Sequence, residues 1–384
     1  MAIFNSLGSN YNFQYVIKSL FSDSYGRSLK LKNYLTDKYR GKVILTYKGR
    51  EALTLALKIL NLPKESCIAI NGFTCFTVYR SIETAGYTPI CLDLEKENTD
   101  LNFSSEILKK TLLENEKIKA VVIQNTLGYS CDMDNIKKIC TEKNIILIED
   151  LAHCVGTKYE NKQEAGTVGD IIALTFSQDK VIDAVSGGAL IIRNKKYLNG
   201  DNFQLKKPKG QLRDKMYPLL TYKIRILYSY GLGKILHFIL KKLDLLSKPM
   251  RKGLYNLYSL PDWYCNLTLF EFRKLNQQLN HRKEIARIYA KKISKKILNS
   301  NINSKISTSS NLRFPIFVED RGDLIKFLKK DKIFVSDIWY FDVAPECPNA
   351  VKVSKKILNL PTHININKED ALKISERINK WLKS

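Results

Sequence analysis

The chain has 384 residues and carries 63 Lys and Arg against 38 Asp and Glu, which gives a net charge of +25. Its hydrophobic content of 44% supports a sizeable packed core, which excludes a disordered or low-complexity protein. The length suggests two domains, or one large α/β unit plus a smaller one. No apolar run reaches the length of a membrane span, and the first residues lack the basic and apolar regions of a secretory signal. We therefore expect neither.

Cysteine and histidine give no metal-binding pattern. The eight cysteines are scattered without any C-x-x-C pair, and the chain has only four histidines. We predict no metal site and expect reduced cysteines in a cytoplasmic protein. The excess positive charge is compatible with nucleic acid, a membrane surface or an anionic substrate as partner. A lysine-rich composition without any special partner would explain most of it equally well.

Short apolar runs alternate with helical patterns between residues 43 and 193. This alternation predicts an α/β fold with a mostly parallel sheet covered by helices. The predicted strands are 43–47, 67–70, 89–92, 120–124, 145–148, 171–176 and 189–193. The predicted helices are 49–60, 77–85, 104–113 and 132–142.

The composition changes in segment 204–252, where 13 Lys and Arg stand against 2 Asp, a charge of 13 − 2 = +11. Residues 234–246 have amphipathic spacing. One face would carry Lys234, His237, Lys241 and Asp244, and the other Leu236, Ile239, Leu240 and Leu243. A long helix is predicted from residue 267, followed by a smaller C-terminal α+β domain with a strand at 313–318 and helices at 322–330 and after 367.

Ligands of parallel sheets bind at the carboxyl ends of the strands, so the residues after each strand are candidates for a site. Gly49, Arg50 and Glu51 lie between a strand and a helix, where backbone N–H groups and a guanidinium suit a phosphate. The chain lacks the glycine patterns of dinucleotide-binding and P-loop proteins.

Three further candidates follow later strands. Asp150 ends an apolar strand, where its carboxylate could pair with a cofactor cation or cap a helix. In a turn or helix His153 would lie on the same side as Asp150. Lys180 fits either a partly desolvated Schiff-base lysine or one more solvated surface lysine.

The order and spacing of these features resemble the DegT/DnrJ/EryC1/StrS family of sugar aminotransferases, which are fold type I pyridoxal-phosphate enzymes. The likeness runs from about residue 40 to the C-terminus, except for segment 204–252. The motifs that carry it are KGREAL at 48–53, NGFT at 71–74, DMD at 132–134, IED at 148–150 and the glycine pair at 187–188.

The resemblance implies an aspartate-aminotransferase-like fold with pyridoxal 5′-phosphate as cofactor. Lys180 would form the Schiff base and carry protons, Asp150 would keep the pyridine nitrogen protonated, and His153 would lie near the phenolic oxygen. The implied phosphate ligands are Gly49, Arg50, Glu51 and Thr175. The implied domains are a cofactor domain at 1–203, a basic insertion at 204–255, and a linking helix with a small domain at 256–384.

Two positions are informative about the reaction. One departs from the family pattern, and the other distinguishes two branches of the family. Cys75 replaces an aromatic residue that stacks on the pyridine ring, with Phe73 and Phe76 as candidates to substitute for it. A lysine at position 180, in place of the histidine of the family's dehydratase branch, favours transamination over deoxygenation.

The function implied by the resemblance is transfer of an amino group, from glutamate, to a nucleotide-linked or lipid-linked keto-sugar for cell-surface polysaccharide or glycan biosynthesis. We expect a homodimer. We also expect no binding to nucleic acid, since the basic segment has no recognisable nucleic-acid-binding motif. Two alternatives stay open. One is a non-catalytic sensor or scaffold, and the other is peripheral membrane binding at the inner face of the membrane through residues 216–246.

Overall fold

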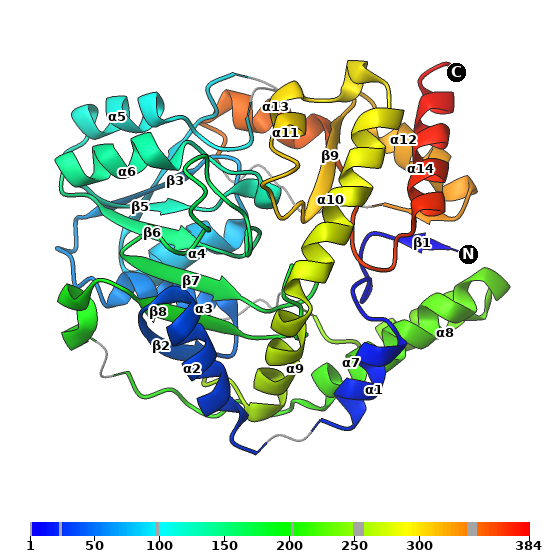
Figure 1. The fold of residues 1–384 in the computed structure, drawn as a ribbon, viewed down its shortest axis with the longest axis horizontal. Helices are drawn as coiled ribbons and strands as arrows, with labels where there is room; N and C mark the ends of the chain where they lie inside the picture. The colour runs from blue at the N-terminus through cyan, green and yellow to red at the C-terminus, as the bar shows by residue number, and fades with distance from the viewer. Residues whose placement is uncertain (1, 23–24, 97–99, 201–202, 249–256, 336–343) are drawn as a thin grey trace.

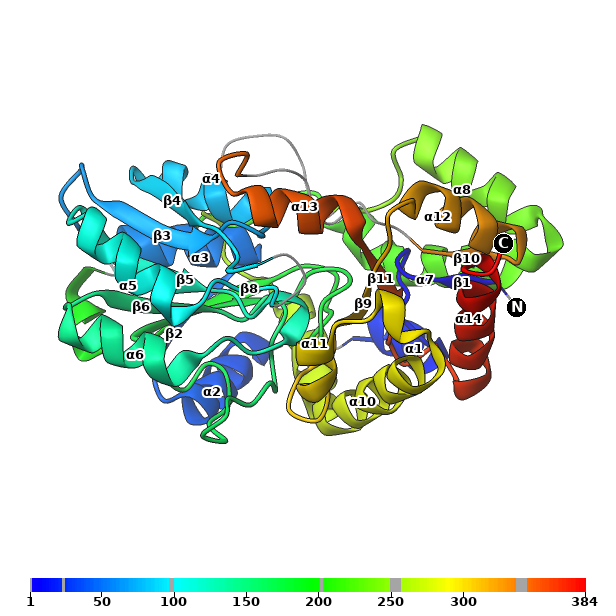
Figure 2. The ribbon, with the colours of Figure 1, turned by 90° about the horizontal axis from the view of Figure 1, so that it is seen from above.

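The computed structural model describes residues 2–22, 25–96, 100–200, 203–248, 257–335 and 344–384. A large domain built on one sheet lies beside a smaller domain, and a long helix runs between them (Figures 1 and 2). Residues 249–255, the end of the predicted basic insertion, lie outside the described residues.

A seven-stranded sheet in the order β2-β8-β7-β6-β5-β3-β4 forms the large domain. Strands β4, β3, β5, β6 and β7 run parallel to one another, and β8 is antiparallel to both β2 and β7. The predicted mostly parallel sheet is therefore confirmed. The strands are β2 (Lys42–Thr46), β3 (Cys67–Asn71), β4 (Thr88–Leu92), β5 (Ile118–Ile123), β6 (Ile146–Asp150), β7 (Ile171–Thr175) and β8 (Gly188–Ile192).

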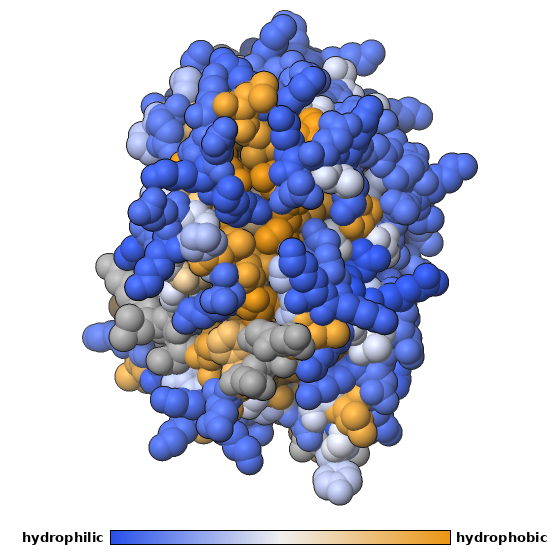
Figure 3. All heavy atoms as spheres, turned by 90° about the vertical axis from the view of Figure 1, so that its left-hand side faces the viewer, coloured by the Kyte–Doolittle hydropathy of each residue, from blue (hydrophilic) through white to orange (hydrophobic). Residues whose placement is uncertain are grey.

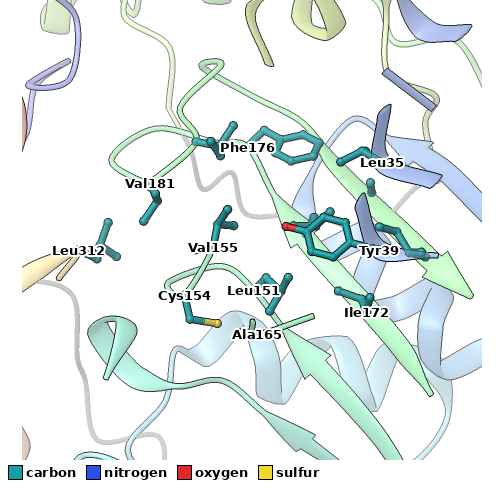
Figure 4. Packing of buried hydrophobic residues seen from close by; sticks show 14 of the residues in the cluster. Leu35, Tyr39, Leu151, Cys154, Val155, Ala165, Ile172, Phe176, Val181 and Leu312 are labelled. Carbon is teal, nitrogen blue, oxygen red and sulfur yellow. The ribbon is translucent and has the colours of Figure 1, made fainter. Parts of the chain in front are cut away.

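Successive side chains of each strand point to opposite faces of the sheet. Both sets are apolar here, so both faces of the sheet are hydrophobic. In β5, Val121 and Ile123 belong to one buried cluster, while Ala120 and Val122 belong to another. Figure 4 shows the first cluster, with Leu35 and Tyr39 beside the sheet. The covering helices are α2 (Arg27–Tyr39), α3 (Gly49–Lys58), α4 (Phe76–Ala85), α5 (Ser105–Glu114) and α6 (Met133–Glu142).

The predicted long helix is two helices, α9 (Asp262–Arg273) and α10 (Leu275–Lys292). Lys274, with φ −97° and ψ −1°, ends the first and begins the second. The small domain contains an antiparallel pair, β9 (Arg313–Phe317) and β11 (Ile357–Pro361). Its other elements are α11 (Ser300–Ser304), α12 (Arg321–Lys330), β10 (Ile333–Phe334), α13 (Pro348–Lys356) and α14 (Lys368–Trp381). Short 3₁₀ turns lie at Thr126–Gly128, Lys195–Gly200, Tyr228–Tyr230 and Lys295–Ile297.

The basic segment is partly a core element. Its first helix, α7 (Leu212–Leu227), buries Tyr217 and Ile224 in the large hydrophobic cluster. The Asp214 carboxylate accepts hydrogen bonds from the hydroxyls of Tyr47 at 2.7 Å and Tyr264 at 2.9 Å. These contacts join α7 to the residue that follows β2 and to α9, so residues 212–227 belong to the fold of the large domain.

The predicted amphipathic helix is α8 (Leu232–Lys242). Leu240 is buried and Leu236 packs against the core, as expected. Ile239 and Leu243, however, are 45% and 60% exposed. The predicted apolar face is therefore present on α8, but only part of it is covered by the rest of the protein.

The N-terminal segment crosses between the domains. Its β1 strand (Ile3–Phe4) pairs with β10 of the small domain, and α1 (Phe13–Leu20) packs on α7. Between them, Asn10 and Tyr11 donate hydrogen bonds to the Asp183 carboxylate at 2.9 and 2.7 Å. The same carboxylate accepts the backbone N–H groups of Asp179 at 2.8 Å and Val185 at 3.0 Å. One buried carboxylate thus joins the N-terminal segment to the loop that carries Lys180.

Replacing this carboxylate should destabilise the protein strongly. Asp183→Ala leaves buried donors without an acceptor, and we expect the free energy of unfolding to fall by about 3 kcal/mol. Urea unfolding followed by circular dichroism measures the loss. Asp134→Ala is the control, because the exposed Asp134 accepts one side-chain bond, from Asn161, and should cost about 0.5 kcal/mol or less. Equal losses in the two variants would show that Asp183 is not a structural centre.

Candidate active site

The N-terminus of α3 lies directly against the ends of β7 and β8. A Cβ atom built on Gly49 would lie 1.9 Å from Oγ1 of Thr175, and one on Gly188 would lie 2.7 Å from Cα of Gly49. Only glycine permits so close an approach. The structure therefore brings Gly49, Arg50 and Thr175 together, at a helix N-terminus whose N–H groups suit an anion.

Glu51 belongs to the same helical turn, but its carboxylate is engaged within the chain. It accepts the backbone N–H groups of Lys48 and Tyr258, each at 3.3 Å. Burial raises the pKa of Glu51 to about 7, and these two N–H groups partly oppose the shift. The Glu51 side chain thus supports the helix start, which leaves its backbone as the part that could contact a phosphate.

Lys180 lies in the loop after β7, which closes where the N–H of Ala184 donates to the carbonyl of Phe176 at 2.8 Å. The carbonyl of Lys180 accepts a bond from Asn10 at 3.2 Å. Burial lowers the pKa of the Lys180 amine, while the charges of Cys75 and Asp150 raise it less strongly. This is the partly desolvated amine that a Schiff-base lysine requires.

Asp150 is the last residue of β6 and is buried. Its Oδ1 accepts the N–H of Ala152 at 2.9 Å. Burial raises the pKa of Asp150 to about 6, and this N–H and the Lys180 charge hold it from rising further. Within the described stretch 100–200, β6 is followed by turns and not by a helix, so Asp150 does not cap a helix.

His153 is also buried and is held by hydrogen bonds to its Nδ1 atom. The N–H of Leu127 donates to Nδ1 at 3.3 Å, and the Gln124 amide nitrogen lies 3.2 Å from it. Because Nδ1 accepts, the proton of the neutral ring is on Nε2. Burial and the nearby charge of Lys180 lower the pKa of His153 well below its usual range. The sequence had not indicated Gln124, which is fixed in turn by a hydrogen bond from Thr74.

The three residues considered for the ring-stacking position, Cys75, Phe73 and Phe76, have different surroundings in the structure. Cys75 is the residue before α4, and its charge raises the pKa of Lys180. Phe73 is buried in a cluster with Leu127 and Tyr129. Phe76 is 53% exposed and stacks on Tyr79 at a ring-centroid distance of 6.4 Å.

A buried arginine that the sequence analysis missed also acts on the site. Arg313, the first residue of β9, donates to the carbonyl of Asn5 at 2.6 Å and lies 3.8 Å from Asp179. Its positive charge lowers the pKa of both His153 and Lys180, after the larger effect of burial. The only sequence signal was an arginine at the start of an otherwise apolar strand.

These groups fit pyridoxal phosphate. The amine has a lowered pKa, the acid lies at a strand end, the imidazole is neutral, and a helix N-terminus adjoins a threonine hydroxyl. The described residues contain no group of three or more His, Cys, Asp or Glu side chains arranged to hold a metal ion.

The raised pKa of Asp150 predicts a pH-dependent gain in stability for Asp150→Asn in the cofactor-free protein. The native state binds the Asp150 proton more tightly than the unfolded chain, so wild-type stability falls as the pH rises through about 6. The variant lacks this loss and should be more stable at pH 8 by about 3 kcal/mol, with a small difference at pH 4. Urea unfolding across this range measures it, with Asp134→Asn as control. A difference that does not change with pH would contradict the burial of this carboxylate.

Known proteins resemble the chain in sequence over parts of their length. It is 28% identical over 208 residues to the GDP-perosamine synthase of Vibrio cholerae, covering 54% of this chain and 52% of that protein. It is 27% identical over 337 residues to the UDP-4-amino-4,6-dideoxy-N-acetyl-beta-L-altrosamine transaminase of Campylobacter jejuni, covering 83% and 80%. The chain thus spans about half the length of the first relative and most of the second.

Solved structures and a family model match the chain almost completely. PseC of Helicobacter pylori, an aminotransferase involved in the biosynthesis of pseudoaminic acid, has a TM-score of 0.72 at 18% identity and covers 100% of both chains. TlmJ, an aminotransferase from Streptoalloteichus hindustanus, has a TM-score of 0.73 at 16% identity, covering 100% of this chain and 99% of that one. The aminotransferase fold is therefore confirmed. The DegT/DnrJ/EryC1/StrS aminotransferase family model matches residues 28–379, and the chain belongs to this family.

Proposed function

We propose that the protein is a pyridoxal-phosphate-dependent aminotransferase that moves an amino group from glutamate to a keto-sugar. The observation that carries the proposal is the half-buried Lys180 amine, whose lowered pKa and electrostatic contact with Asp150 suit covalent attachment of the cofactor. Family membership and the sugar-modifying relatives support the reaction class.

The bound cofactor would supply an electron sink for the carbon that loses or gains nitrogen. Asp150 would hold a proton on the pyridine nitrogen, and the Nε2–H of His153 would donate toward the phenolic oxygen. The backbone of residues 49–51, the Arg50 guanidinium and the Thr175 hydroxyl would bind the phosphate. Lys180 would anchor the cofactor and then move a proton to and from the substrate carbon, since a desolvated amine is neutral more often at pH 7.

The positive charge near the site supports glutamate as the amino donor. It also supports an acceptor sugar joined to an anionic carrier. Arg313 places a buried positive charge near Lys180, where it would favour a carboxylate. The two curated relatives have names that refer to GDP- and UDP-linked sugars. We propose an acceptor joined through phosphate to a nucleotide or a lipid, for cell-surface polysaccharide or glycan synthesis. A homodimer in the cytoplasm is the assembly that we propose for it.

Removing the lysine should abolish covalent cofactor binding. Wild-type protein with pyridoxal phosphate is expected to be yellow, whereas Lys180→Ala is expected to be colourless after gel filtration, with transaminase activity reduced by about 10⁴-fold or more. Visible absorption spectra measure the first effect. Lys138→Ala, on the exposed side of α6, is the matched control and should stay yellow. A colourless wild type would refute the proposed cofactor.

A non-catalytic sensor is the alternative that Cys75 motivates, and glutamate distinguishes the two. Adding glutamate to the yellow enzyme, without any sugar, should bleach the visible band and release one 2-oxoglutarate per bound cofactor. Spectroscopy combined with enzymatic assay of 2-oxoglutarate measures this half-reaction, with D-glutamate as the control. A protein that keeps its colour and forms no 2-oxoglutarate would support the sensor.

A further inference from the structure

We propose that α8 docks this protein on the surface of an anionic phospholipid bilayer. The outer side of α8 carries Leu232, Ile235, Ile239 and Leu243, which are 45–60% exposed. Their spacing of three to four residues places them in one stripe along the helix. A stripe of large aliphatic side chains facing solvent needs a partner.

The stripe is not the helix's packing face, because the inner side of α8 has its own apolar residues. Leu240 is buried, and Leu236 packs against the large hydrophobic cluster. A Cβ atom built on Gly233 would lie 2.3 Å from the carbonyl oxygen of Ile224 in α7. This close backbone contact with α7 fixes how α8 is rotated about its axis, so the outer stripe cannot turn inward.

Around the helix Lys242 lies beside Ile235 at the edge of the stripe, and Phe238, which is 67% exposed, lies between Lys242 and the row of Lys234 and Lys241. Lys234, Lys241 and Lys242 are all exposed on α8, and Lys248 follows it. The one acidic residue nearby, Asp244, is already neutralised by Arg213 at 2.5 Å and Lys248 at 2.6 Å. Apolar residues flanked by lysines are the pattern of interfacial helices, where the aliphatic residues enter the headgroup region and the amines contact lipid phosphates.

The apolar surface extends from α8 onto its neighbours. In α7 and the turn after it, Ile226 and Tyr230 are exposed. Phe13 of α1 lies 6.2 Å from Tyr222 of α7, measured between ring centroids. Both α1 and α8 pack on α7, so this part of the molecule collects exposed aromatic and aliphatic residues from three helices.

A membrane surface fits this patch better than a second copy of the chain. In a symmetric dimer the lysine rows of two α8 helices would face each other and repel, whereas anionic headgroups would neutralise them. Among the described residues no helix has the length and apolar content to cross a bilayer. In Figures 1 and 2, α8 projects at the end of the molecule away from the large sheet.

Figure 3 shows the face at the other end of the molecule, where hydrophilic side chains surround a central band of hydrophobic ones. Leu113 of α5 is 63% exposed and belongs to the large domain, so it provides a control position of similar exposure to the α8 stripe.

Because α7 is part of the core, deleting residues 216–246 would disrupt the fold. Point substitutions on α8 avoid this.

Vesicle co-sedimentation with the full-length protein tests the proposal without measuring activity, so its failure and that of the proposed reaction are distinguishable. Wild-type protein should sediment with vesicles of equal parts phosphatidylcholine and phosphatidylglycerol, and much less with phosphatidylcholine alone. Ile235→Ser with Ile239→Ser, and separately Lys234→Glu with Lys241→Glu, should each weaken binding about tenfold or more. Leu113→Ser should bind like wild type. High salt should weaken the binding of the wild-type protein to anionic vesicles, because it screens the lysine charges.

Either of two vesicle results would overturn the proposal: a wild-type protein that stays in the supernatant with anionic vesicles, or α8 variants that sediment as fully as a wild type that binds. A larger oligomer of the wild type that both α8 variants reduce in size on gel filtration would also overturn it, since the stripe would then be an interface between copies. Unchanged thermal midpoints would show that the variants, which alter exposed side chains only, remain folded.

Discussion

The site depends on the burial of Lys180 beside Asp150 at the carboxyl ends of β6 and β7. Burial lowers the pKa of the amine and raises that of the carboxyl, and the attraction between them limits both shifts. A desolvated pair costs stability, so the surrounding structure must hold it in place. That cost is the physical reason why the chain devotes buried polar groups to this region.

Two buried carboxylates provide the support. Asp183 ties the lysine loop to the N-terminal segment, which itself pairs with the small domain. Glu149, next to Asp150, accepts the Tyr159 hydroxyl at 2.8 Å and the N–H groups of Gly166 at 2.7 Å and Gly169 at 2.6 Å. The end of β6 is therefore held by the loop that binds Glu149, and the Lys180 loop is held by the N-terminal segment. Displacing either should move the site as well as lower stability.

Local patterns predicted much of this structure, and long-range contacts account for the rest. Apolar runs located the strands, because both faces of the sheet are covered, and strand ends located Asp150, His153 and Lys180. The helix start predicted the backbone of Gly49 to Glu51 as a phosphate contact, but it did not predict that the Glu51 carboxylate accepts the N–H of Lys48. Arg313 and Asn10 reach the site only through folding, from residues far apart in the chain. The positive charge of segment 204–252 gave no sign that α7 is core while α8 is surface.

The central claim is that Lys180 is the residue that binds the cofactor covalently. Borohydride reduction of the yellow protein, followed by proteolysis and mass spectrometry, identifies the modified lysine among the many in the chain. The account predicts a single pyridoxyl-phosphate label, on the peptide that contains Lys180. A label on a different lysine, or a reduced protein without any label, would contradict it.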